Sequence, residues 1–331
     1  MPMPVLKICF RTKGNHKQGM GDVTGSLALA EEFKSRDCQV SFLIDPDTET
    51  VDLIKTSDYE FHLIAKNSTD ALDNLIFDIV IVNQLNTSSE ELSWLKGHGR
   101  KLVTIDDVGE PSRRLADLRI NPLYFDEDAL CDIRYIPLHA VFGRAHRQAK
   151  TINPRIANIL VTMGGSDTYG FTPQILGALS DIDAYVTVIL GSAFKHYEEL
   201  KKVIAQSKRS FEIRNSIDIE TMCQCIEEAD LAICGAGNTL FEMACCGTPV
   251  IVICNEPFEE ETAYRLEQKG FGRVIPFNET LDQIKLKDFL RQYETKEIRE
   301  TQSKTGMSLI DGMGTKSSVD KILEPLPTSV L

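Results

Sequence analysis

One stretch of the chain, at positions 234–253, reads Cys-Gly-Ala-Gly-Asn-Thr-Leu-Phe-Glu-Met-Ala-Cys-Cys-Gly-Thr-Pro-Val-Ile-Val-Ile. It continues an apolar run that starts at Leu231 and predicts a buried strand, a glycine turn, a helix over 238–246 and a second buried strand over 250–253. Strands that alternate with helices in this way are typical of a parallel α/β sheet.

The glycine turn has the features of an anion-binding loop. Gly235 and Gly237 carry no Cβ, so the backbone there can approach a ligand closely. The helix that follows offers unpaired N–H groups and the positive end of its dipole, which favour a phosphate. Glu242 lies about one helical turn further on, where its carboxylate can accept ribose hydroxyls. The alternative is an ordinary strand-turn-helix connection with helix-capping glycines.

Composition bounds the class of protein. The chain has 331 residues, enough for two domains of ordinary size or one large one, and 42% hydrophobic with 26% charged residues is typical of a globular protein. A formal net charge of −13 argues against nucleic acid or an anionic membrane as the main partner.

The cysteines and the apolar runs indicate the compartment. Nine scattered cysteines, mostly within apolar runs, favour free thiols in a reducing environment, and none has zinc-site spacing. The start of the chain is too short and too interrupted by proline for a signal peptide, and no run reaches the ~18 apolar residues of a membrane span. We therefore expect a cytoplasmic protein without a transmembrane segment, a metal or a cofactor.

The rest of the chain repeats the alternation. Further strands are predicted at 6–11, 39–44, 79–82, 101–105, 158–163 and 184–190, and helices at 24–36, 90–97, 172–180, 197–206, 219–228 and 260–269. An irregular, basic segment at 137–154 predicts a linker, so we expect a Rossmann-like domain over 1–145 and a second over 146–331. Because ligands of open α/β sheets bind at the carboxyl ends of the strands, the two doubly wound domains are expected to face a central cleft.

Five motifs occur in order along the chain. They are Arg11 with Gly19-Met-Gly21 and Ser26-Leu-Ala-Leu-Ala30, then Val103-Thr-Ile-Asp-Asp107, Ile159-Leu-Val-Thr-Met-Gly-Gly-Ser-Asp167, Asp230-Leu-Ala-Ile-Cys-Gly-Ala-Gly-Asn-Thr-Leu-Phe-Glu-Met-Ala244 and Ile310-Asp-Gly-Met-Gly314. Over nearly the whole chain they resemble the GT-B-fold group of UDP-sugar hydrolases of pseudaminic acid synthesis and spore-coat polysaccharide proteins. The peptidoglycan GlcNAc transferase is a more distant likeness.

The resemblance implies that the C-terminal domain binds UDP. Glu242 would take the ribose, and Gly164 and Gly165 would border the pyrophosphate. The phosphates would meet Gly237, Asn238, Thr239 and Leu240, where N–H groups and the helix dipole can stabilise the leaving diphosphate without a metal. Asp106 and Asp107 end a strand of the N-terminal domain on the cleft side, where they could orient an acceptor or the sugar; the alternative is capping and turn chemistry before Gly109. The same domain would contribute Gly19, Gly21 and Arg11, with the sugar read by Glu259 in the acidic run 259–261. That run also suits the start of a helix in any protein.

Departures from the family concern the sugar and the catalytic base. The hydrolases read Gly-x-Gly-His and continue to an arginine, and that histidine is their proposed base; this chain has Asp22 and Gly25 there. Asp22 is our leading replacement, because a carboxylate can accept a proton from an attacking hydroxyl. The alternative is that Asp22 only caps the helix expected from Thr24. His16, in the same loop, is the second catalytic candidate, with solvated surface as its alternative.

These observations predict an enzyme, a glycosyltransferase that uses a UDP-sugar in surface polysaccharide or glycoconjugate synthesis, with inversion at the anomeric carbon. A UDP-sugar hydrolase of the pseudaminic type with a replaced base, or a catalytically silent nucleotide-sugar binding protein, are the alternatives. The sequence does not identify the acceptor or the oligomeric state.

Overall fold

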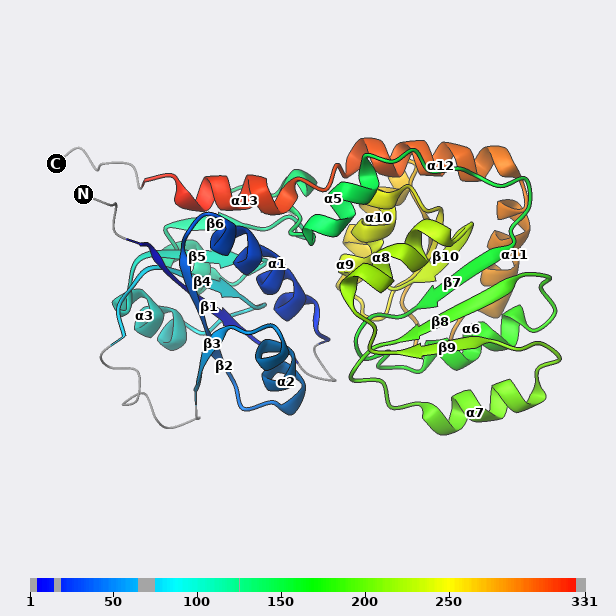
Figure 1. Ribbon diagram of the computed structural model, residues 1–331, viewed down its shortest axis with the longest axis horizontal. Coiled ribbons are helices and arrows are strands. Elements are labelled where there is room, and N and C mark those ends of the chain that lie inside the picture. The colour runs from blue at the N-terminus through cyan, green and yellow to red at the C-terminus, as the bar shows by residue number, and fades with distance from the viewer. Residues whose placement is uncertain (1–4, 15–18, 65–74, 125, 326–331) are drawn as a thin grey trace. The chain divides into compact units, whose positions relative to one another are not determined.

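Two parallel β-sheets organise the chain, one in each of two compact units (Figure 1). The computed structural model describes residues 5–14, 19–64, 75–124 and 126–325. The first unit comprises Met1–Pro137 and Met313–Leu331, and the second comprises Leu138–Gly312. The predicted α/β class with two doubly wound units is confirmed.

The first unit contains a six-stranded sheet in the order β3-β2-β1-β4-β5-β6. Its strands are β1 (Lys7–Thr12), β2 (Gln39–Ile44), β3 (Glu60–Leu63), β4 (Phe77–Asn83), β5 (Gly99–Ile105) and β6 (Leu118–Ile120). Its helices are α1 (Gly21–Ser35), α2 (Thr48–Thr56), α3 (Ser89–Gly97), α4 (Glu110–Leu115), the short 3-10 helix η2 (Ile133–Tyr135) and α13 (Gly314–Leu323).

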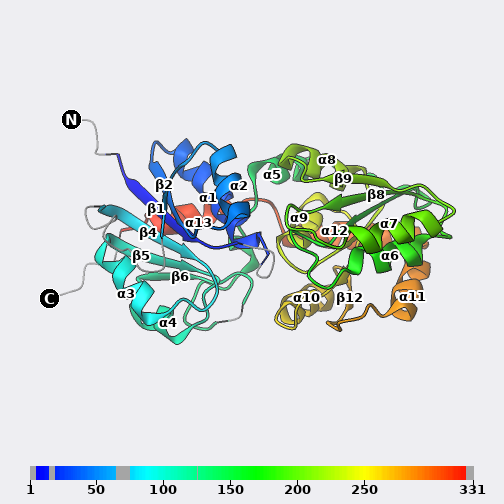
Figure 2. The ribbon, with the colours of Figure 1, turned by 90° about the horizontal axis from the view of Figure 1, so that it is seen from below.

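Both faces of this first sheet are buried. Because side chains alternate along a strand, Ile8 and Phe10 of β1 pack in one cluster with α1, whereas Cys9 packs in another with Leu92 of α3. Figure 2 shows α1 and α2 on one side of the strands and α3 and α4 on the other. Burial of both faces explains why the strands read as continuous apolar runs.

The second unit also has a six-stranded parallel sheet, in the order β12-β11-β10-β7-β8-β9. Its strands are β7 (Asn158–Thr162), β8 (Tyr185–Leu190), β9 (Glu212–Asn215), β10 (Leu231–Cys234), β11 (Val250–Ile253) and β12 (Arg273–Ile275). Its helices are α5 (Ala140–His146), α6 (Phe171–Leu179), α7 (Tyr197–Gln206), α8 (Ile219–Glu228), α9 (Asn238–Cys246), α10 (Glu259–Gln268), α11 (Gln283–Tyr293) and α12 (Lys296–Leu309).

The strands that the sequence predicted are the central ones, and each lies within two residues of its predicted bounds. The strands that it missed are β3, β6, β9 and β12, which form the four sheet edges. An edge strand is covered less completely and carries a weaker apolar signal. In β3 and β9, for example, the burial is only partial throughout.

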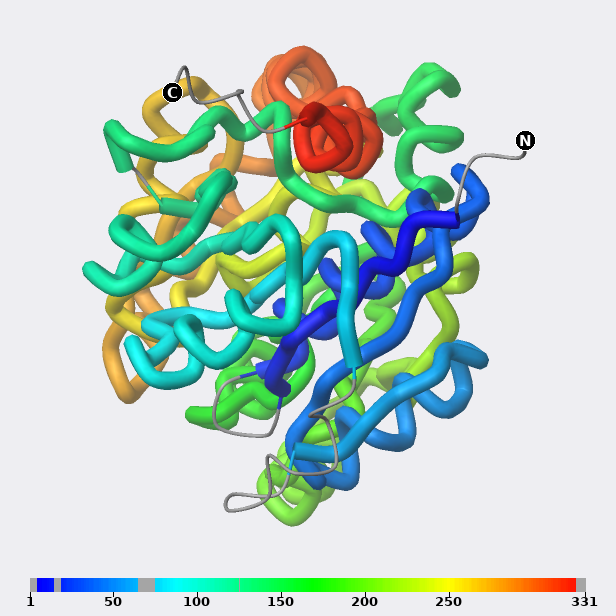
Figure 3. The backbone as a smooth tube through the Cα atoms, turned by 90° about the vertical axis from the view of Figure 1, so that its left-hand side faces the viewer, coloured from blue at the N-terminus to red at the C-terminus, as the bar shows by residue number. Residues whose placement is uncertain are grey.

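The predicted division at 145/146 requires two corrections. The boundary lies at 137/138, because the helix α5 belongs to the second unit. The helix α13 belongs to the first unit, where Val319 and Ile322 are fully buried in the same cluster as Ile8. Figure 3 shows α13, in red, beside the green segment that contains η2.

Lys101 of β5 fixes the end of α13. Its ammonium group donates hydrogen bonds to the carbonyl oxygens of Ile322 and Glu324, each at 2.8 Å, and the residue is only 8% exposed. The charge lies where the helix leaves carbonyl groups unpaired, which is favourable at a helix C-terminus.

We predict that Lys101→Met lowers the free energy of unfolding of the first unit by about 1–3 kcal/mol, because two carbonyl groups lose a charged donor. Urea denaturation followed by circular dichroism measures the change. The matched control is Lys55→Met on α2, an exposed lysine, which should leave stability unchanged. Equal stability of the two variants would contradict the anchoring role.

Candidate nucleotide site and acidic cluster

In the second sheet, the order in which the chain adds strands reverses at β7. The chain runs outward through β8 and β9 on one side and through β10, β11 and β12 on the other, so the loops after β7 and β10 leave the sheet in opposite directions. A crevice outside the carboxyl ends of the strands at such a switch point is the general ligand site of open α/β sheets. The glycine pairs of the predicted site both follow these two strands.

The loop after β7 is held from both sides. A Cβ on Gly191, which follows β8, would lie 2.3 Å from the carbonyl oxygen of Gly165 and 2.4 Å from that of Gly164, so only glycine allows this packing. At the other end, the Asp167 carboxylate accepts hydrogen bonds from the amides of Phe171 and Thr172 at 2.7 and 2.8 Å. The Gly164-Gly165 turn is therefore fixed in place before any ligand arrives.

Asn255, just after β11, connects this loop to the one after β10. Its Nδ2 donates to the carbonyl oxygen of Met163 at 3.4 Å, and a Cβ on Gly235 would lie 2.5 Å from the same nitrogen. Its backbone amide donates to the Glu259 carboxylate at 2.6 Å. Three loops that are far apart in sequence are thus tied together at one edge of the sheet.

The start of α9 faces open space. A Cβ on Gly164 or Gly237 would meet no atom within 4 Å, and no side chain caps the helix at Gly237. Asn238 and Thr239 are partly exposed in its first turn. Leu240 is a correction: it is fully buried and its amide donates to the carbonyl oxygen of Gly237, so it does not face a ligand.

Glu242 is one turn along α9 and is partly buried. Among the described residues, no group donates a hydrogen bond to its carboxylate or forms an ion pair with it. Burial raises its pKa to about 7. A carboxylate that is shielded from water and has no hydrogen-bond donor is energetically unfavourable. Such a group is a candidate for binding hydroxyl donors of a ligand.

Glu259 requires a second correction. Its carboxylate is occupied by backbone amides, those of Asn255 and Ala236, and burial raises its pKa to about 7 although these amides lower it. The residue therefore supports the loop of Gly235 and Gly237 from beneath. The resemblance to the family placed it on the sugar, and a glutamate at the start of a helix gives no sign in the sequence of which backbone amides it contacts.

In the first unit, Asp22 lies in the first turn of α1. The helix begins at Gly21 with Met20 as its N-cap, so the alternative that Asp22 caps a helix starting at Thr24 is wrong. Burial raises the pKa of Asp22 to about 7. Asn83 of β4 fixes the turn by donating to the Asp22 carbonyl oxygen at 2.9 Å. Among the described residues, none donates a hydrogen bond to its carboxyl group.

Three other candidates, Gly19, Gly21 and His16, lie in the loop before α1 or at its start. Gly19 adopts a φ of +80°, which favours glycine, and Gly21 is exposed at the start of α1. His16 lies outside the described residues, so its catalytic role stays a prediction.

Arg11 is a third correction. It is only 2% exposed, and its guanidinium pairs with Glu91 at 2.6 Å and with Asp45 at 2.9 Å. Both carboxylates belong to the same unit, so the charge of Arg11 is already compensated within the sheet. An arginine at the end of a strand looks the same in the sequence whether it meets a ligand or an internal carboxylate.

Asp107 is a fourth correction. It is fully buried, and its carboxylate accepts hydrogen bonds from the amides of Gly109 at 2.9 Å and Thr87 at 3.2 Å. It therefore holds two loops together, which is the capping and turn role that was its alternative. Asp106 follows Ile105, whose register partner Asn83 holds the turn of Asp22. The sequence of two adjacent aspartates does not show which carboxyl group is bound by backbone amides of its own unit.

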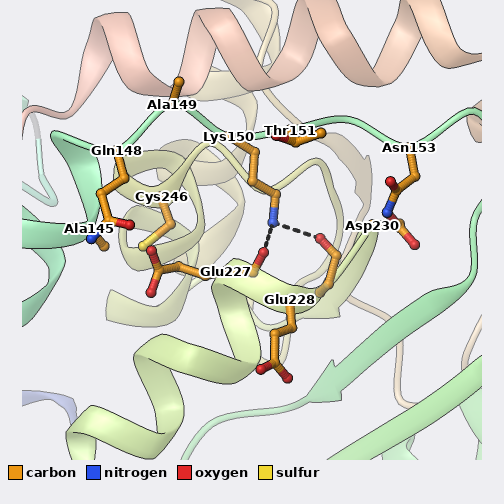
Figure 4. A pocket seen from close by; sticks show the side chains of 11 residues that line it. Ala145, Gln148, Ala149, Lys150, Thr151, Asn153, Glu227, Glu228, Asp230 and Cys246 are labelled. Carbon is orange, nitrogen blue, oxygen red and sulfur yellow. Dashed lines mark hydrogen bonds between the residues drawn. The ribbon is translucent and has the colours of Figure 1, made fainter.

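A cavity of about 300 Å³ lies at the opposite edge of the second sheet, before β7 and β10. Figure 4 shows Lys150 pointing toward the end of α8, where it donates to the carbonyl oxygens of Ile226, Glu227 and Ala229. Asp230 is occupied by Asn153 and by the amides of Ala157 and Asn158. Lys150 and Asp230 are thus hydrogen-bonded within the protein, and they connect the segment before β7 to the end of α8 and the start of β10.

The part of the chain that the structure describes contains neither a cluster of metal ligands nor a membrane-spanning helix. No group of three or more histidine, cysteine or acidic side chains there could hold a metal ion. None of its helices is long and apolar enough to cross a bilayer.

Known proteins resemble this chain in sequence. Residues 158–313 match the glycosyltransferase family 28 C-terminal domain. The spore coat polysaccharide biosynthesis protein SpsG of Bacillus subtilis is 26% identical over 325 residues, 91% of this chain and 93% of SpsG. An uncharacterized protein of Methanocaldococcus jannaschii is 25% identical over 276 residues, 77% of this chain. The match spans 57% of the archaeal protein, little more than half of its length.

Solved structures share the fold. MurG of Acinetobacter baumannii has a TM-score of 0.64 at 17% identity, over 96% of this chain and 99% of MurG. The UDP-GlcNAc 2-epimerase of Neisseria meningitidis, solved with UDP-GlcNAc, has a TM-score of 0.64 at 10% identity, over 97% of this chain and 100% of the epimerase. The predicted GT-B architecture is confirmed, and residues 158–313 of the second unit are similar to the glycosyltransferase family 28 C-terminal domain.

Proposed function

We propose that this protein transfers a sugar from a UDP-sugar donor to a hydroxyl group of an acceptor in surface polysaccharide or glycoconjugate synthesis. The observation that carries the proposal is Glu242, a partly buried carboxyl group without a described partner, one turn beyond a helix start that no side chain caps. A cis-diol such as that of ribose supplies two hydroxyl donors to such a carboxylate.

The loops beside Glu242 suit the rest of the nucleotide. Gly164 and Gly237 leave open space next to backbone that is already fixed by Gly191 and Asn255. The α9 dipole favours the charge that develops on a leaving diphosphate. The structural neighbour solved with UDP-GlcNAc and the family 28 domain support a nucleotide-sugar donor, and SpsG supports a place in polysaccharide synthesis.

In the proposed reaction the acceptor oxygen attacks the anomeric carbon and the bond from that carbon to the phosphate oxygen breaks. The configuration inverts because the attack is a single displacement. UDP leaves with the bonding electron pair, and Asp22 takes the proton of the acceptor hydroxyl. A pKa of about 7 suits a base at neutral pH, because about half of the carboxyl groups are ready to accept a proton and the resulting acid is weak.

The first test incubates the purified protein with a panel of UDP-sugars, with and without candidate carbohydrate acceptors, and follows UDP release. Release that depends on an acceptor supports the transferase. Release of UDP and free sugar in water alone would identify a hydrolase, and binding without release in any mixture would identify a silent binding protein.

We predict that Glu242→Gln weakens UDP binding by about 10- to 100-fold in isothermal titration calorimetry, since a charge-assisted hydrogen bond contributes about 1.5–3 kcal/mol. The control is Glu261→Gln on α10, an exposed glutamate, which should keep the wild-type affinity. Unchanged affinity in Glu242→Gln would rule out the ribose contact.

The same variant should be more stable than the wild type at pH 8. The folded-state pKa of Glu242, about 7, exceeds its ordinary value of 4.5, so the folded protein binds the extra proton and stability falls as the pH rises between these values. Glutamine does not titrate, so the difference in melting temperature should vanish near pH 4. A variant that loses both stability and affinity at pH 8 would mean a structural role instead.

For Asp22→Asn we expect a loss of turnover of at least about 100-fold with UDP affinity unchanged, because general base catalysis contributes about 10²–10⁴-fold. Steady-state kinetics with the productive acceptor and calorimetry with UDP separate the two effects. Full activity in this variant would remove Asp22 from the mechanism.

A further inference from the structure

Asn255 lies between the two glycine loops of the proposed nucleotide site. Its side-chain Nδ2 donates a hydrogen bond to the carbonyl oxygen of Met163 at 3.4 Å. On the other side, a Cβ on Gly235 would lie 2.5 Å from Nδ2 and 3.9 Å from the same carbonyl oxygen. The glycine at position 235 therefore makes room for the Asn255 amide group, because any larger residue would meet its nitrogen.

The direction of the Asn255 amide group follows from its neighbours. The Met163 carbonyl group accepts hydrogen bonds but cannot donate one, so Nδ2 and not Oδ1 faces it. Oδ1 is then buried and has no hydrogen-bond partner among the described residues. A buried acceptor without a donor lowers stability, and an apolar side chain would avoid that loss. The stability of the fold alone therefore does not account for an asparagine at this position.

All three carbonyl groups of the turn 163–165 point toward partners within the second unit. The first accepts from Asn255, the second lies 2.4 Å from the place that a Cβ on Gly191 would take, and the third accepts from the amide of Ala193 at 3.0 Å. In a trans peptide the N–H group points away from the preceding carbonyl group, and the described chain has no cis peptide. The N–H groups of residues 164–166 are therefore turned away from these partners, and none of them donates a hydrogen bond within the part of the chain that the structure describes.

Successive N–H groups without partners form a concave site for an anion. Gly164 is the position whose orientation the backbone does not fix by itself. Its φ is +76°, and glycine adopts positive and negative φ about equally readily, so the peptide that precedes it can turn over. A Cβ on Gly164 would meet no atom within 4 Å, so space for a ligand is open beside it. The hydrogen bond from Asn255 holds this peptide with its N–H group directed away from Asn255.

We propose that Asn255 is a positioning residue, which holds the peptide between Met163 and Gly164 so that the Gly164 N–H group donates to the diphosphate of the nucleotide. Asn255 acts through the Gly164 amide and does not itself touch the nucleotide. The proposal rests on the UDP site of the proposed function and adds the residue that orients one of its donors. It also explains the side-chain oxygen without a partner, since the nitrogen is the atom that the site uses.

The test compares the binding of UDP and of uridine to the wild type and to Asn255→Leu in isothermal titration calorimetry. Leucine keeps the branched shape, lacks the donor and adds no charge. The affinity for UDP should fall about 10- to 100-fold, because a hydrogen bond to a charged group is lost. Uridine has no phosphate and should bind as it does to the wild type, and the melting temperature should not fall. Equal weakening of both ligands would indicate a merely structural role and overturn the proposal.

The matched control is Asn278→Leu, at an exposed asparagine after β12, which should keep both affinities. A wild type that binds no UDP would overturn the proposed function and this inference with it. A wild type whose UDP binding depends on Glu242, together with full UDP affinity in Asn255→Leu, would overturn this inference alone.

A measurement on the wild type covers failure of Asn255→Leu to fold. Methionine labelled with ¹³C at its carbonyl group and glycine labelled with ¹⁵N give one NMR signal for each Met-Gly pair, and the chain has such pairs at 20–21, 163–164 and 313–314. Met20→Leu and Met313→Leu each remove one signal and so identify that of Gly164. UDP should shift the Gly164 signal, whereas uridine should leave it in place. An unmoved signal in protein saturated with UDP would overturn the proposal.

Discussion

Parallel strands all end at the same edge of their sheet, and every proposed site depends on this constraint. In the second unit it brings the loops after β7, β10 and β11 together, where Asn255 links them. In the first unit it brings Asp106, at the end of β5, next to the turn that Asn83 holds. Residues separated by up to about a hundred positions become neighbours because the crossover helices return each strand in the same direction.

Both edges collect carboxyl groups that the fold does not neutralise. Burial raises the pKa values of Asp22, Asp106 and Glu242 well above the ordinary range of acids. Each such group lowers stability when ionised, so the fold carries them at a cost in free energy. Arg11 and Asp107 show the contrast, because a paired charge or a pair of backbone amides satisfies a buried group completely. We therefore propose the sites from carboxyl groups without partners and not from the presence of a charge alone.

The sequence predicted the class of fold and the central strands, because strands buried on both faces carry strong apolar runs. It missed the edge strands, whose exposed side dilutes that signal, and it assigned α13 to the wrong unit, because a tail helix does not reveal which sheet it covers. Within the sites, Glu242 and Asp22 were selected from the glycine loops before them. Arg11, Asp107 and Glu259 were misjudged because hydrogen-bond partners distant in sequence decide whether a polar side chain is free or occupied.

The most direct test of the nucleotide site is a crystal structure of the protein with UDP. The account predicts that the ribose hydroxyls contact the Glu242 carboxylate and that the phosphates lie against Gly164, Gly237 and the start of α9. Nucleotide bound instead at the opposite edge of the second sheet, in the cavity beside Lys150, would contradict it.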